Sequence, residues 1–137
     1  MLARAAPLPT ATNVPWALEL KWDGVRAQVR VERGRLTLRT RPGRDATCEF
    51  PELAPIGEAV HGHRVILDAE LVRLDTDGHP DFAAVAARPG GHRHAAADPG
   101  IVLQVFDLLH FDGRTICTLP YRERRELLAE LAEQLPS

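Results

Sequence analysis

The residue types best suited to chemistry lie in one short stretch, from Glu19 to Arg26, which reads E-L-K-W-D-G-V-R. Lys21 within it is the only lysine, because sixteen of the seventeen lysine and arginine residues are arginine. A guanidinium stays protonated in proteins, whereas an amine can lose its proton and attack an electrophile. The single lysine therefore indicates a nucleophile. The alternative is a solvated lysine at the end of a strand.

Other segments carry side chains that could assist such an attack. Asp68 and Glu70 are two residues apart in an alternating segment, so on a strand both would lie on one face and could hold a metal ion. Paired acids are also common on solvated surfaces. Phe106 could stack on a base or fill the core. Arg41, in a T-R-P-G-R segment, could contact a phosphate or belong to a simple turn.

Together these segments resemble the motifs of one enzyme class in their usual order. E-x-K-x-D-G-x-R resembles motif I of the covalent nucleotidyltransferases, which are ATP-dependent DNA ligases, RNA ligases and mRNA capping enzymes. The segment 40–47 resembles ligase motif Ia, with Pro42 in place of the asparagine of S-R-N-G. The segment 67–71 resembles motif III, with Ala69 in the glycine position. The segment 105–113 closely resembles the F-D-L-L-Y-L-D-G stretch of bacterial end-joining ligases. The chain is thus similar to the N-terminal part of the adenylation (nucleotidyltransferase) domain of a bacterial ATP-dependent DNA ligase of the end-joining type.

This resemblance implies a set of roles. Lys21 would be the catalytic residue that carries AMP, and Glu70 would also serve a metal ion. The cofactors would be ATP and Mg²⁺ or Mn²⁺, and the partner would be nicked or broken double-stranded DNA. The residues that would contact the nucleotide are Glu19, Leu20, Arg26, Arg41, Glu70 and Phe106.

The implied reaction accounts for the residue types. An amine attacks the α-phosphate of a nucleoside triphosphate only when neutral, and the charge that develops on the phosphate oxygens needs cations nearby. The segment 21–45 holds eight basic residues and three acidic ones, although the whole chain has a net charge of −2 and a pI near 6.3. A basic segment beside an acidic body can bind a triphosphate or a DNA end. A solvated arginine-rich hairpin is the alternative.

Hydropathy patterns and turn residues predict the elements that position these groups. Most strands follow one another through short turns and must pair antiparallel. The expected fold class is α+β, with mainly antiparallel sheets and flanking helices, as in an incomplete nucleotidyltransferase (ATP-grasp-like) domain. The predicted strands are 16–21, 25–31, 36–40, 64–75 and 101–107 continuing to 111, the last covered on both faces; the helices are 51 or 52 to 60, 81–87 and 120–135; residues 1–15 form an extended lead-in and 88–99 a loop.

The resemblance covers nearly the whole chain, residues 1–137, as one partial adenylation domain. Motif IV, the lysines of motif V and the OB-fold domain of the family find no match in it. A separate chain could supply them. Three functions stay open: the nucleotide-binding portion of a DNA ligase for repair and recombination, incomplete or inactive alone; a non-catalytic module that binds adenine nucleotide or DNA ends; and an RNA ligase or capping-type nucleotidyltransferase.

Composition excludes several other classes of protein. No stretch approaches the roughly 18 apolar residues of a membrane span, so we expect a cytoplasmic protein with no membrane partner. Cys48 and Cys117 lack the spacing of a zinc site or a disulfide framework. Two histidine pairs, at 61 and 63 and at 92 and 94, could form a metal clip, but no cysteine or carboxylate accompanies them at zinc spacing. We therefore expect structural or solvated histidines.

Overall fold

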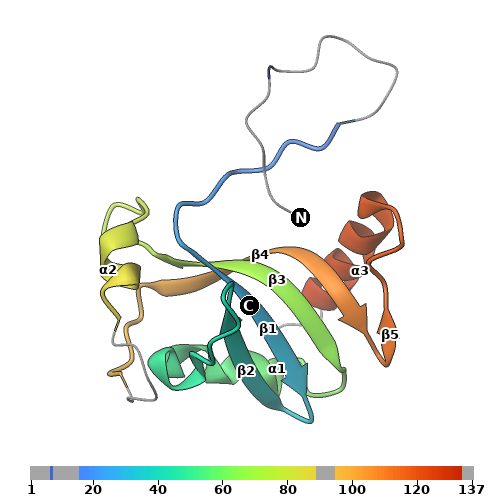
Figure 1. Cartoon of the computed structure of the whole chain (residues 1–137), viewed down its shortest axis with the longest axis horizontal. Helices are drawn as coiled ribbons and strands as arrows, with labels where there is room; N and C mark the ends of the chain where they lie inside the picture. Colours follow the sequence, from blue (N-terminus) through green and yellow to red (C-terminus); the bar gives the residue numbers. More distant parts are fainter. Residues whose placement is uncertain (1–6, 8–15, 89–94, 134–137) are drawn as a thin grey trace.

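A twisted antiparallel sheet forms the body of the protein. The computed structural model describes residue 7, residues 16–88 and residues 95–133. Within these residues the strand order is β2-β1-β3-β4-β5 (Figure 1). The strands are β1 (Val25–Glu32), β2 (Arg35–Thr40), β3 (Val65–Arg73), β4 (Ile101–Phe111) and β5 (Arg114–Thr115). The predicted α+β class with an antiparallel sheet and flanking helices is confirmed.

The hairpin of β1 and β2 follows directly from its sequence. Ala27, Val29 and Val31 are buried, and they alternate with charged or polar residues on the other face. Arg33 and Gly34 at the tip have positive φ values of 53° and 76°, which suit a tight two-residue turn. The register runs from Glu32 opposite Arg35 to Ala27 opposite Thr40. The hairpin therefore presents one apolar face and one basic face.

Helices cover the apolar side of the sheet. Two 3-10 turns, Thr47–Glu49 and Pro51–Leu53, lead into α1 (Ala54–Ala59), which packs against β2. Helix α2 (Phe82–Ala86) is capped by Asp81, whose carboxylate accepts a hydrogen bond from the Ala84 N–H. Helix α3 (Tyr121–Glu133) packs against β4 and buries Leu128 and Leu131. Figure 1 shows α1 and α3 at opposite edges of the sheet.

The pairing of β3 with β4 contains two irregularities. Their register shifts between Ile66 and Leu67 and again between Asp68 and Ala69. At the second shift Asp68 lies opposite Asp107 and Ala69 opposite Val105. Phe106 consequently has no Cα partner on β3. An extra residue of this kind bends a strand and changes the direction of its side chains.

The predicted strand 16–21 is wrong. The residues from 16 to 23 have no regular secondary structure, and they approach the start of β1 from outside the sheet (Figure 1). Leu18 and Leu20, which were expected on an apolar face, are 92% and 77% exposed. Alternation marks residues that would share a face, but a strand also requires a neighbouring strand for its backbone groups, and no described strand forms a ladder with this segment.

Smaller corrections concern the ends and burial of elements. The helix expected from residue 51 or 52 begins with a 3-10 turn, and its α-helical part starts at Ala54. Strand β4 is not covered on both faces, since the residues from Val102 to Phe106 are only half-buried. The helix expected over 120–135 is described as far as Glu133. Three predicted parts lie outside the described residues: the lead-in apart from residue 7, residues 89–94 of the loop, and residues 134–137. No helix in the described part of the chain combines the length and apolar character needed to cross a membrane.

Candidate functional site

The polar face of the sheet brings together acids and bases that are far apart in the sequence. Arg26 on β1 is the register partner of Glu70 on β3, and Gln28 is the partner of Asp68. All four side chains belong to the face opposite the buried residues of β1. Phe106 of β4 joins them through its contact with Arg26. The sheet thus gathers three of the segments that the sequence singled out.

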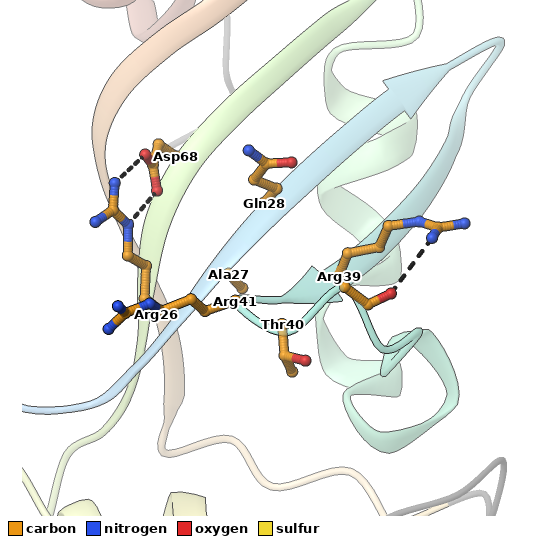
Figure 2. Close-up of a pocket in the computed structure, with 8 residues that line it drawn as sticks. Arg26, Ala27, Gln28, Arg39, Thr40, Arg41 and Asp68 are labelled. Carbon is orange, nitrogen blue, oxygen red and sulfur yellow. Dashed lines mark hydrogen bonds and ion pairs between the residues drawn. The ribbon is translucent and has the colours of Figure 1, made fainter. Parts of the chain in front are cut away.

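Arg26 is the central residue of this group. Its Nε lies 2.9 Å from Asp68 Oδ1 and one terminal nitrogen lies 2.6 Å from Asp68 Oδ2, which is a bidentate pair (Figure 2). The same guanidinium lies over the Phe106 ring, 5.4 Å from its centroid. Hydrogen bonding to Asp68 raises the pKa of Arg26, so its guanidinium stays protonated. Both oxygens of Asp68 are engaged by this pair.

Glu70 lies where the chain enters β1. Burial raises the pKa of its carboxyl above the ordinary value, against the lowering effect of Arg26, of a hydrogen bond from the Gly24 N–H and of Lys21. A Cβ at Gly24 would stand 2.1 Å from the carbonyl oxygen of Leu71, so only glycine allows this close approach. The Asp-Gly of the first motif therefore holds Lys21 in the electrostatic neighbourhood of Glu70. Lys21 itself is exposed.

A second group of contacts lies at Glu19. Its carboxylate accepts a hydrogen bond from the Tyr121 hydroxyl and lies 3.5 Å from Nε of Arg125, both on α3. A pocket of about 270 Å³ opens beside it. Its walls are formed by the segment before β1 and by β4: Leu18, Glu19, Leu20, Trp22, Gln104, Val105, Phe106 and Arg125. Three residues expected at the nucleotide, Glu19, Leu20 and Phe106, thus line one cavity.

Arg41 lies at a separate, adjoining pocket of about 340 Å³ (Figure 2). The turn that carries it is closed by a hydrogen bond of 2.7 Å from the Gly43 N–H to the Thr40 carbonyl, so Pro42 is accommodated. Gly43 has a φ of 88°, a value that favours glycine. Arg26 and Asp68 line the same pocket. Arg26 therefore stands between the cavity of Phe106 and that of Arg41.

The basic face of the hairpin forms a wider groove beyond this pocket. A cavity of about 630 Å³ is lined by Arg30, Arg33, Arg35 and Arg39 together with two acids, Glu32 and Asp45. Arg30 and Glu32 form an exposed pair at 2.5 Å. The arginines outnumber the acids, so the groove favours a polyanion.

Sequence reasoning missed the two residues that contact Glu19. Tyr121 and Arg125 lie near the start of the helix predicted over residues 120–135, for which the sequence indicated no role at the site. Their spacing of four residues places them on one face of α3, which was a usable signal. Nothing in the sequence indicated that this face meets Glu19. Asp68 was expected beside a metal ion, whereas the structure pairs it with Arg26.

His61 and His63 belong to no group of potential metal ligands among the described residues. His61 contacts the carbonyl of Glu58 through Nδ1, and His63 lies 2.8 Å from Asp112 and stacks on Phe111. The other pair, at 92 and 94, lies outside the described residues. Cys48 and Cys117 are free thiols.

Comparison with known proteins gives consistent similarities. The family model described as ATP dependent DNA ligase domain matches residues 1–137. The chain is 41% identical over 132 residues to the multifunctional non-homologous end joining DNA repair protein LigD of Mycobacterium tuberculosis H37Rv, covering 96% of this chain and 16% of that protein. It is 39% identical to a probable DNA ligase of Streptomyces griseus, covering 96% of this chain and 27% of that protein.

Solved structures show the same likeness. The crystal structure of the ligase domain of M. tuberculosis LigD superimposes with a TM-score of 0.72 at 38% identity, covering 85% of this chain and 37% of that one. A mycobacterial DNA ligase D complexed with ATP and MES gives a TM-score of 0.74 at 39% identity, with coverages of 85% and 36%. The chain therefore spans little more than a third of the solved domains that it matches.

Proposed function

Because the chain belongs to the ATP-dependent DNA ligase domain family, we propose that it forms the nucleotide-binding portion of a ligase adenylation domain, in which Lys21 becomes linked to AMP. One observation carries the proposal. The sheet register brings Arg26, Glu70 and Phe106 together, with the charge of Lys21 acting to lower the pKa of Glu70, and these residues come from three separate family motifs. A surface lysine in an unrelated fold would have no reason to share a site with them.

The proposed step is an exchange of one bond for another at phosphorus. The lone pair of Lys21 Nζ attacks the α-phosphorus of ATP, the bond from that phosphorus to the bridging oxygen breaks, and pyrophosphate leaves with the electron pair. The amine loses its protons to water or to a nearby carboxylate. Arg26 and Arg41 stabilise the charge that develops on the phosphate oxygens. The adenine lies in the cavity of Leu20 and Phe106, where the ring offers a stacking surface.

The residues present fit a divalent metal ion through Glu70. Mg²⁺ is commonly bound by one or two carboxylates together with phosphate oxygens, and Glu70 offers a carboxylate next to Lys21. Asp68 does not contribute, since Arg26 occupies both of its oxygens. Bound there, Mg²⁺ or Mn²⁺ would neutralise charge on the phosphates.

We assign the second ligand, nicked or broken double-stranded DNA, to the basic groove of the hairpin. Arg30, Arg33, Arg35 and Arg39 line it on the same face of the sheet as Arg26, so a DNA end would lie beside the adenylated lysine. Neutralisation of backbone phosphates makes such binding strongly dependent on salt. DNA repair by end joining would place the protein in the cytoplasm with the chromosome.

A non-catalytic module that binds adenine nucleotide is the second candidate. One observation favours it: Lys21 is the only lysine of these 137 residues, so they hold no candidate for the lysines of motif V. A separate chain that supplies motifs IV and V and an OB-fold would restore a complete site. Residues 1–137 would then be one partial domain of a split enzyme.

Covalent labelling tests the proposal. Incubation of the 137-residue chain with α-labelled ATP and Mg²⁺ or Mn²⁺ should give slow labelling that is stable to base and labile to acid, as a phosphoramide is. Lys21→Arg should abolish it. The matched control adds Arg33→Lys to Lys21→Arg, which returns an amine to the same basic segment and should not restore the label. A label that survives Lys21→Arg would refute the assignment, and ATP binding without any label would favour the non-catalytic module.

A further inference from the structure

The segment from residue 16 to residue 23 must be held in place by something other than its own secondary structure. It precedes β1 without a hydrogen-bonded strand partner among the described residues. Three of its large apolar side chains, Trp16, Leu18 and Leu20, are exposed, and Trp22 is half-buried. Burial of apolar area therefore contributes little to its position. Yet it carries Lys21 and one wall of the pocket that faces Phe106. Polar contacts with the rest of the protein must therefore hold the segment in place.

Glu19 supplies such a contact from the middle of the segment. Its carboxylate accepts a hydrogen bond from the Tyr121 hydroxyl and forms an ion pair with Arg125 at 3.5 Å. Tyr121 and Arg125 are four residues apart on α3 and share one face of it. A hydrogen bond and an ion pair thus hold the same carboxylate.

Arg125 reaches the opposite wall of the pocket as well. One of its terminal nitrogens lies 3.3 Å from the carbonyl oxygen of Phe106, while its Nε faces Glu19. A single guanidinium therefore connects the segment before β1 with β4 across the cavity.

The base of this connection is rigid. Arg124 forms a buried bidentate pair with Asp107, at 2.8 and 2.9 Å, and donates to the carbonyl of Leu119 at 2.6 Å. Its guanidinium also lies over the Tyr121 ring, 5.7 Å from the centroid. These contacts fix the first turn of α3 to the strand that carries Phe106. Burial, assisted by Glu19, raises the pKa of Tyr121 to about 12, so the hydroxyl remains a donor at neutral pH.

We propose that Tyr121 and Arg125 are positioning residues that hold Glu19 and so set the width of the nucleotide pocket between the segment 18–22 and Phe106. The inference rests on the proposed function, since it assigns adenine to this pocket. The family motif suggested that Glu19 contacts the nucleotide. In this inference the Glu19 carboxylate instead holds the segment to α3, and its neighbours in the segment 18–22 form the pocket wall that contacts adenine.

The chain offers a direct test of the contact without nucleotide. Trp16 and Trp22 are its only tryptophans, and both lie in the segment, so tryptophan fluorescence reports on that segment alone. Tyr121→Phe keeps the ring beneath Arg124 and removes the donor; it should lower the fluorescence anisotropy and increase quenching by acrylamide. Arg122→Ala is the matched control, because Arg122 is exposed on the same helix and pairs with Glu126. Equal signals in Tyr121→Phe and wild type would overturn the inference.

Tyr121 is also the only tyrosine, so an alkaline absorbance titration follows it individually. Glu19→Ala should lower the pKa of Tyr121, because the hydrogen bond and the charge of Glu19 both raise it. The remaining burial keeps it above the ordinary value of 10.0. An unchanged titration in folded Glu19→Ala, with folding checked by circular dichroism, would show that the two groups do not interact.

ATP binding completes the test through a double-mutant cycle on the full chain. A hydrogen bond to a charged group contributes enough for Tyr121→Phe and Glu19→Ala each to weaken ATP binding by about tenfold. If Tyr121 acts through Glu19, the double variant should be no weaker than the single ones, and Arg125→Lys should retain more affinity than Arg125→Ala. If the losses of ATP affinity in the two single variants multiplied in the double variant, or if no variant altered ATP binding, the positioning role would be overturned while the proposed function stood. If tryptophan fluorescence shows the contact between Tyr121 and the segment but the wild-type chain does not bind ATP, the proposed function would instead be refuted.

Discussion

Arg26→Met should destabilise the fold far more than removal of a neighbouring arginine from the same strand. The change keeps an apolar stem of similar length and a sulfur that can contact the Phe106 ring. It removes both hydrogen bonds from Asp68, whose side chain is 7% exposed. An unpaired buried carboxylate is costly, and loss of one partner from a buried ion pair typically costs about 3 to 5 kcal/mol.

The geometry sets the expected value within that range. Arg26 is 26% exposed, so water can partly solvate Asp68 in the variant, and we expect a loss of about 3 kcal/mol in the free energy of unfolding. Lost contact with the Phe106 ring adds about 0.5 kcal/mol at most after the sulfur contact is allowed for. For a chain of this size the melting temperature should fall by roughly 12 °C.

Arg30→Met is the control, two residues along the same face of β1. Arg30 is 57% exposed, and its pair with Glu32 belongs to the class of surface ion pairs worth about 0 to 1 kcal/mol. Urea unfolding followed by far-ultraviolet circular dichroism would measure both variants. Adding Asp68→Asn to Arg26→Met should recover at least half of the loss, because the buried charge is then gone. Equal losses in the two arginine variants, or no recovery with Asp68→Asn, would refute the reasoning.

Three further predictions concern the nucleotide and the reaction. Phe106→Ala should weaken ATP binding by about 1 to 3 kcal/mol in equilibrium dialysis, as loss of a stacking surface does, and GTP should bind less well than ATP to the wild type; equal affinities would indicate a packing role for the ring. Burial raises the pKa of Glu70 in the folded protein, so ionisation of Glu70 destabilises the fold as the pH rises through that pKa. At about pH 7 the Glu70→Gln variant should therefore melt at a higher temperature than the wild type. At about pH 4 the two melting temperatures should differ little. The 137-residue chain should not seal nicked DNA in a gel assay, because each lost charge-stabilising group lowers the rate by a factor of about 10² to 10³. Sealing only after addition of a separately expressed C-terminal half would support a split ligase. Sealing by the chain alone would contradict the role given to motifs IV and V.

Local features of the fold were predictable from sequence because the residues that cause them are neighbours. The turn at Arg33 and Gly34 needs positive φ values at its own two positions, and the cap of α2 is the side chain of Asp81 on the N–H of Ala84. The long strand 64–75 appears as β3 with only its ends displaced. In each case the decisive interaction spans a few residues.

Features that depend on distant pairing could not be predicted. Alternation placed Asp68 and Glu70 on one face, but only the register of β1 against β3 shows that Arg26 bonds to Asp68 and leaves Glu70 for other partners. The same holds for Tyr121 and Glu19, which are 102 residues apart. The family resemblance indicated which residues belong to the candidate site, and the long-range contacts show which of these residues bond to one another.

The extra residue in β4 limits the changes in length that this strand can tolerate. Phe106 and Asp107 are adjacent, yet one contacts the Arg26 guanidinium and the other the Arg124 guanidinium. Deletion of one residue between positions 104 and 107 would remove the extra residue, and the pairings on either side of it would keep their register. The Phe106 ring or the Asp107 carboxylate would then be lost or turned in another direction, although no residue was substituted. A scan of single-codon deletions should accordingly find residues 104–107 intolerant and the exposed turn at residues 76–78 permissive, which would make the bulge the feature that fixes the length of this strand during divergence.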